Sequence, residues 1–60
     1  MYEVNNIRDY EGMYEYAVIF WCEGGYWFWS AWDDRERAEQ SARDREGAFV
    51  VRMCDVIALW

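Results

Sequence analysis

The sequence predicts an α+β domain, in which an antiparallel β-meander carries one helix on one face in the order β-β-β-α-β. Three observations predict it. Two apolar runs meet at Gly24-Gly25, an acidic helix start follows at Asp33, and another apolar run begins after Gly47. With 60 residues, the chain is expected to form a single domain, 1–60, near the lower size limit for folding alone.

The first predicted element is a weak strand over residues 2–8, because Asn5-Asn6 interrupts its apolar pattern. The segment 9–12 has the composition of a type I turn that closes on glycine. Residues 13–22 and 26–32 then form a strong hairpin, since a Gly-Gly pair supplies the positive φ angles of a two-residue turn.

A helix is predicted to begin at Asp33, which acts as the N-cap, and Glu36 completes a capping box. Gly47 marks the end of this helical segment. One helix face carries mainly small side chains, which lets the helix lie close to a sheet rich in aromatic side chains. The residues of this face are Ala38, Ser41, Ala42 and Arg45. Residues 48–54 form the closing strand, and an apolar tail follows at 55–60.

Both faces of the predicted hairpin are apolar, because large side chains occupy odd and even positions alike. A single helix covers only one face. We therefore expect a homo-oligomer that buries the other face, since a monomer rarely exposes so large an apolar patch. The expected interface residues are Ile19, Trp21, Phe28, Trp32, Leu59 and Trp60.

The charge predicts a protein partner rather than a nucleic acid. The chain carries a formal net charge of −6 and has no lysine, so it lacks the basic patch that releases counterions from DNA. An acidic surface instead favours encounter with a basic protein. The residues expected to contact a partner are Glu11, Glu15, Glu23 and Tyr26.

An aromatic sheet can also stack single-stranded bases, at about 1–3 kcal/mol per contact. Trp21, Tyr26, Phe28 and Trp32 are the residues that could do so. The charges nearest to them are Glu15 and Glu23, whereas base-stacking platforms carry basic grooves. A protein interface is therefore the favoured interpretation, and direct binding to nucleic acid stays as the alternative.

Patterns that indicate catalysis or cofactor binding are not found. The sequence has no histidine and no lysine, and Cys22 and Cys54 are widely separated, so neither a triad nor a zinc site is predicted. Asp33, Asp34 and Glu36 form the densest acidic group, which is typical of a helix N-terminus. We expect a non-enzymatic protein with free cysteines, no metal and no cofactor.

The segment 14–53 resembles small phage and prophage accessory proteins of the anti-CRISPR, or anti-defence, type. The resemblance lies in an aromatic hairpin around Gly24-Gly25, an acid-capped helix with an alanine face, and a closing strand. It implies an inhibitor of a host defence nuclease, in the cytoplasm of a bacterial host. An oligomeric DNA-associated protein and a purely structural oligomeric module are the alternatives.

No membrane association is expected, because the longest uncharged apolar run, Tyr16–Cys22, is far shorter than a membrane span.

Overall fold

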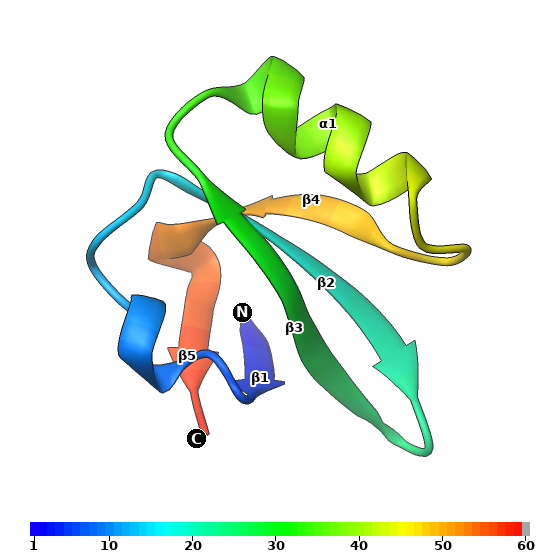
Figure 1. The fold of residues 1–60 in the computed structure, drawn as a ribbon. Helices are drawn as coiled ribbons and strands as arrows, with labels where there is room; N and C mark the ends of the chain where they lie inside the picture. Colours follow the sequence, from blue (N-terminus) through cyan, green and yellow to red (C-terminus); the bar gives the residue numbers. More distant parts are fainter. Residues whose placement is uncertain (60) are drawn as a thin grey trace.

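The computed structural model describes residues 1–59, and it contains one five-stranded mixed sheet with one α-helix packed on it (Figure 1). The predicted α+β class and the helix on the sheet are confirmed. The strand order is β4-β2-β3-β1-β5. The elements are β1 (Tyr2–Asn5), η1 (Arg8–Tyr10), β2 (Tyr16–Cys22), β3 (Gly25–Trp32), α1 (Arg35–Arg43), β4 (Phe49–Arg52), η2 (Met53–Asp55) and β5 (Val56–Ala58).

The first strand does not continue an antiparallel meander. β1 lies between β3 and β5 and is parallel to both, with Val4 opposite Tyr26 and also opposite Ala58. Neighbouring antiparallel strands are often joined by a tight turn, whereas residues 6–15 form a long connection that contains η1. This connection carries the chain past β3 before β2 begins. The predicted wholly antiparallel meander is therefore corrected to a mixed sheet.

The hairpin turn lies one residue earlier than predicted. Glu23 and Gly24 have φ angles of 50° and 82°, so they form the two-residue loop, and Cys22 pairs with Gly25. Gly25 serves another purpose, because a Cβ atom there would lie 3.2 Å from Nδ2 of Asn5. That amide donates a hydrogen bond to the Tyr26 carbonyl at 3.1 Å, which fastens β1 to β3.

A β-bulge at Trp29 changes the faces of the second half of β3. Ile19 pairs with Phe28 and Val18 pairs with Ser30, so Trp29 is left without a partner. Beyond the bulge, Ser30 and Trp32 lie on the side of the helix. Trp32 Nε1 donates a hydrogen bond to Ser30 Oγ at 2.9 Å. The prediction that Trp32 lies on the face away from the helix is therefore wrong, because regular alternation cannot anticipate a bulge.

The sheet face away from the helix is buried by the curl of the sheet itself. The rings of Tyr2 in β1 and Phe49 in β4 lie 5.7 Å apart, although β2 and β3 separate these strands in the sheet. Inside this curl lies the hydrophobic core, formed by Val4, Ile7, Ala17, Ile19, Val51, Met53 and Val56. Burying each large aliphatic side chain stabilises the fold by roughly 1.5–3 kcal/mol.

Ile19 is therefore not a surface residue. Its exposed fraction is 0%, because the curled sheet and the connection that carries Ile7 enclose it. Its predicted place in an oligomer interface is corrected. Phe28 is half-buried and packs against the same core.

The helix packs on the outer face of the sheet through small side chains, as predicted. Ala38 and Ser41 are the buried residues of α1. The guanidinium carbon of Arg45, which follows the helix, lies 4.1 Å from the centre of the Phe20 ring. Asp34, rather than Asp33, is the N-cap, since its side chain accepts a hydrogen bond from the Glu36 backbone N–H at 2.9 Å. The one-residue shift arises because Asp33 accepts from the Glu15 backbone N–H instead.

The apolar tail becomes part of the sheet. β4 is shorter than the predicted closing strand, and η2 turns the chain so that β5 pairs with β1. Leu59 extends this pairing, because its backbone N–H donates to the Val4 carbonyl at 2.9 Å. Trp60, which was expected at an oligomer interface, lies outside the described residues.

Candidate protein-binding surface

The outer part of the β2–β3 hairpin exposes large aromatic side chains. Trp21, Trp27 and Trp29 have exposed fractions of 58%, 40% and 42%. Figure 1 shows the hairpin extending beyond α1 and β4 to the turn at Glu23-Gly24. Isolated exposed apolar residues are common, but three tryptophans on one hairpin are typical of an interaction site.

On the side of the helix, the aromatic rings are held by specific contacts. Trp29 packs edge-on to Phe20 with ring centres 6.2 Å apart, and Arg45 lies over the same Phe20 ring. Trp27 donates its Nε1–H to the Cys22 carbonyl at 3.2 Å. These contacts limit ring rotation, so Trp27 and Trp29 lose little further freedom when a partner covers them. We refer to Glu23, Trp27 and Trp29 as the hairpin-tip surface.

On the opposite side, Trp21 belongs to a separate aromatic cluster. Its ring packs edge-on to Tyr26 at 4.9 Å, and Tyr26 in turn contacts Tyr2 and Phe49 at 5.2 and 6.0 Å. Tyr26, which was predicted to contact a partner, is half-buried and packs against the Trp21 ring. A shallow groove of about 330 Å³ lies beside Trp21, and Met1 and Leu59 also line it.

The structure does not bring the three predicted partner-binding glutamates together. Glu11 accepts a hydrogen bond from the Ala58 backbone N–H at 3.3 Å, and Glu15 lies 3.6 Å from Arg52. Both line one shallow cavity near η2, whereas Glu23 lies at the far end of β2. The three glutamates therefore do not form one acidic binding patch. Of the three, Glu23 is the residue that lies beside exposed aromatic side chains.

Glu23 has an unusual backbone conformation. Its φ of 50° lies in the left-handed region, which asparagine and glycine adopt with less strain. The left-handed conformation costs a residue with a Cβ atom about 1–2 kcal/mol. The two-residue turn requires a positive φ at this position, and strain of this kind also occurs at functional positions, so Glu23 is a candidate functional residue. The sequence does not predict the positive φ of Glu23, because the glycine pair after it is the expected turn.

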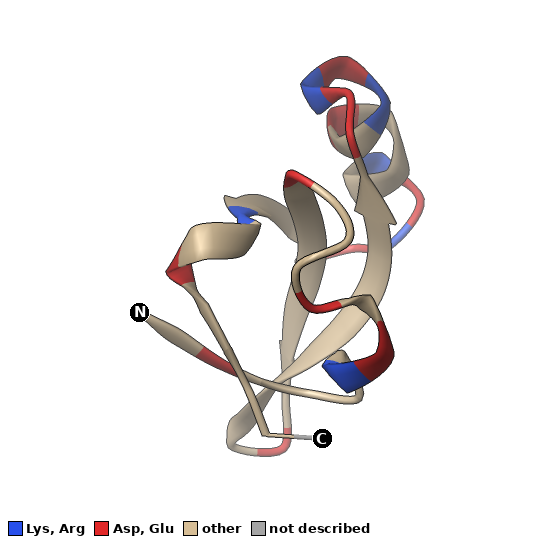
Figure 2. Cartoon of the chain, turned by 90° about the vertical axis from the view of Figure 1, so that its left-hand side faces the viewer, with Lys and Arg blue, Asp and Glu red and all other residues tan. Residues whose placement is uncertain are grey.

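The charge distribution sets Glu23 apart from the other acids. Acidic and basic residues alternate along α1 and its flanking loops, while both hairpin strands are uncharged (Figure 2). Between Tyr16 and Trp32, Glu23 is the only charged residue. The hairpin-tip surface thus combines one negative charge with an apolar surround.

Other chemistry is sparse in the described residues. Within residues 1–59, no group of three His, Cys, Asp or Glu side chains is placed to hold a metal ion. Cys22 and Cys54 are free; Cys22 is half-buried and Cys54 is exposed. None of the helices in this part of the chain is long and apolar enough to cross a membrane.

Comparisons with protein families, with curated proteins and with solved structures find no match to this chain. The candidate functional sites are therefore the exposed surfaces of the chain itself. The hairpin-tip surface is the strongest of these, because aromatic exposure, backbone strain and an isolated charge coincide there.

Proposed function

We propose that the protein is a small non-catalytic inhibitor of the anti-defence kind that its sequence resembles. It binds a host defence nuclease through the hairpin-tip surface, in the cytoplasm of a bacterial host. The observation that carries the proposal is Glu23, a strained and isolated charge beside the exposed Trp27 and Trp29. Tryptophans of this kind dominate binding energy when a partner buries them.

The charge of the chain supports a basic surface on the target. A net charge of −6 accelerates encounter with a positively charged protein through its long-range field. After encounter, Glu23 pairs with a basic group, and Trp27 and Trp29 supply buried apolar area around that pair. Inhibition then requires only that the nucleic-acid site of the target be occupied.

The substitution Glu23→Asn tests the proposal, because it should change stability and binding in opposite directions. Asparagine fits the left-handed turn, so the midpoint of urea unfolding should rise. Loss of the carboxylate should weaken binding to purified CRISPR nucleases at least tenfold, measured by titration of tryptophan fluorescence. The matched control is Glu46→Gln, which removes an exposed acid from the loop after α1 and should leave binding unchanged.

Two results would overturn the proposal. One is unchanged nuclease binding by a stabilised Glu23→Asn variant. The other is the lack of binding to any defence nuclease when the unmodified protein is tested at micromolar concentration.

One observation favours a second candidate, an oligomeric protein that associates with DNA. Trp27 and Trp29 are 40% and 42% exposed on the side of the sheet that carries Arg45, and exposed aromatic rings can stack unpaired bases. The substitution Glu23→Arg separates the two functions. It should weaken binding to a basic protein surface, but it should strengthen binding to single-stranded DNA because it adds a phosphate-binding charge.

A further inference from the structure

The edge strand β4 leaves backbone hydrogen-bonding groups free. Within residues 1–59, β4 pairs only with β2, and Met53 donates its backbone N–H to the Glu15 carbonyl at 2.8 Å. Hydrogen-bonded and non-bonded pairs alternate along an antiparallel ladder. Val51 therefore turns its backbone groups toward β2, whereas Val50 turns its N–H and C=O away from the sheet.

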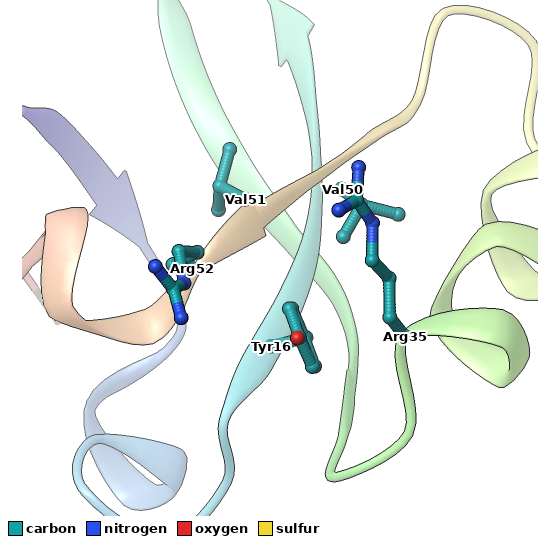
Figure 3. A pocket seen from close by; sticks show the side chains of 5 residues that line it. All are labelled: Tyr16, Arg35, Val50, Val51 and Arg52. Carbon is teal, nitrogen blue, oxygen red and sulfur yellow. The ribbon is translucent and has the colours of Figure 1, made fainter.

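A groove runs along this free edge on the helix side. It has a volume of about 330 Å³ and is lined by Tyr16, Arg35, Val50, Val51 and Arg52 (Figure 3). Tyr16 and Arg52 are neighbours across β2 and β4, and Arg35 reaches the groove from the first turn of α1. The lining therefore holds two guanidinium groups and no carboxylate, although the chain as a whole is acidic.

Both arginines are free to change partners. The Arg52–Glu15 and Arg35–Glu39 ion pairs have N···O distances of 3.6 and 3.8 Å, longer than a charge-assisted hydrogen bond. The two arginine side chains are 64% and 72% exposed. Ion pairs with this exposure contribute about 0–1 kcal/mol, so a better-placed carboxylate can replace the present ones.

We propose that this groove binds an extended acidic segment of a partner protein, which adds to the sheet as a strand beside β4. The free N–H and C=O of Val50 supply main-chain hydrogen bonds, as in other cases of strand addition. Arg35 and Arg52 bind acidic side chains on the helix side of the added strand, and Val50 provides an apolar floor. This surface is separate from the hairpin-tip surface, so the inference goes beyond the proposed function.

The net charge of −6 does not prevent this binding. At physiological ionic strength, exposed charges more than about 8 Å apart are largely screened. The two arginines that line the groove then determine the local preference. We therefore expect affinity for an acidic peptide to be retained at physiological salt, where repulsion by distant acids is largely screened.

The probe is a capped six-residue peptide of alternating valine and glutamate, titrated into the 15N-labelled protein. Saturable changes in the amide shifts of Val50 and Arg52 are expected, and a valine–lysine peptide should cause none. The double substitution Arg35→Gln with Arg52→Gln should weaken binding about tenfold or more, since charge-assisted hydrogen bonds are lost. The matched control is Arg43→Gln, which removes an exposed helix arginine that does not line the groove.

A second variant tests strand addition itself. Val50→Pro removes a backbone N–H that points away from β2 and keeps an apolar side chain at this position, and proline is tolerated at such edge positions. It should abolish peptide binding while the remaining amide spectrum stays native. The inference is overturned if the lysine peptide binds equally well, if the double arginine variant binds normally, or if a folded Val50→Pro variant still binds. Glu23→Asn should leave peptide binding intact, which separates this test from that of the proposed function.

Discussion

The hydroxyl oxygens of Ser30 and Ser41 lie 2.6 Å apart, and this hydrogen bond joins β3 to the buried face of α1. Ser30 also accepts the Nε1–H of Trp32 at 2.9 Å. Ser30 is thus the centre of a three-residue network, which exists only because the bulge at Trp29 turns Ser30 toward the helix. The two serines therefore play unequal parts in holding the layers together.

The first prediction follows from this inequality. Ser30→Ala should lower the free energy of unfolding by about 2 kcal/mol, because it leaves both the Ser41 hydroxyl and the Trp32 indole without a partner. Ser41→Ala should cost less, about 1 kcal/mol, since Ser30 keeps its bond with Trp32. Urea unfolding of the two variants checks the order, and a larger loss for Ser41→Ala would contradict the network.

The second prediction concerns the bulge. Deletion of Trp29 should preserve the fold, because Phe28 and Ser30 already pair with adjacent residues of β2 and keep their faces when the extra residue is removed. Core amide shifts should stay native, while nuclease binding should fall because part of the hairpin-tip surface is lost.

The control for that experiment is deletion of Ala31, in a regular part of β3. This deletion moves Trp32 from the helix side to the inner face of the sheet, where the core has no room for it. It should unfold the protein. If both deletions were equally tolerated, Trp29 would not be an inserted residue.

The third prediction is self-association through the groove beside Trp21. Because the sheet buries its own inner face, the exposed apolar residues that line this groove and could meet a second copy are Met1, Trp21 and Leu59, whereas Ile19 is buried. Light scattering at micromolar concentration should give a mass of at least twice 7.4 kDa.

Trp21→Glu should dissociate this assembly into a folded monomer, since the residue contributes little to the internal core. Circular dichroism distinguishes a folded monomer from an unfolded chain. A monomeric mass for the unmodified protein would contradict self-association.

The fourth prediction concerns the cysteines. Both are free, so a reducing agent should leave the melting temperature unchanged. Cys54 should react with a thiol reagent faster than the half-buried Cys22, and mass spectrometry after partial labelling can compare them. A large fall in melting temperature on reduction would indicate a disulfide.

Local sequence patterns predict local structure well in this chain. The acidic residues before α1 predict its start to within one residue, and the spacing of Ala38 and Ser41 predicts its buried face. The apolar runs predict both hairpin strands. These features depend on short-range geometry, which a sequence states directly.

The features that were missed depend on distant contacts. Gly25 looks like a turn residue, but its lack of a side chain is needed by Asn5, which comes from a different strand. The burial of Ile19 depends on how far the sheet curls, and the bulge at Trp29 has no marker such as a glycine. The hairpin-tip surface could be found in part, because its tryptophans are evident, but the strain at Glu23 requires the observed turn.

The parallel pairing of β1 with β5 also determines how the domain responds to mechanical load. A force that pulls residues 1 and 59 in opposite directions acts along both strands, in which Tyr2 lies opposite Val56 and Val4 lies opposite Ala58. Their hydrogen bonds are then loaded in shear and must rupture together. Pulling apart the open ends of β2 and β3 would instead unzip that hairpin one pair at a time, starting at Tyr16 and Trp32. The short terminal strands thus act as a clamp along one axis, while the longer hairpin is the weaker element under a peeling force.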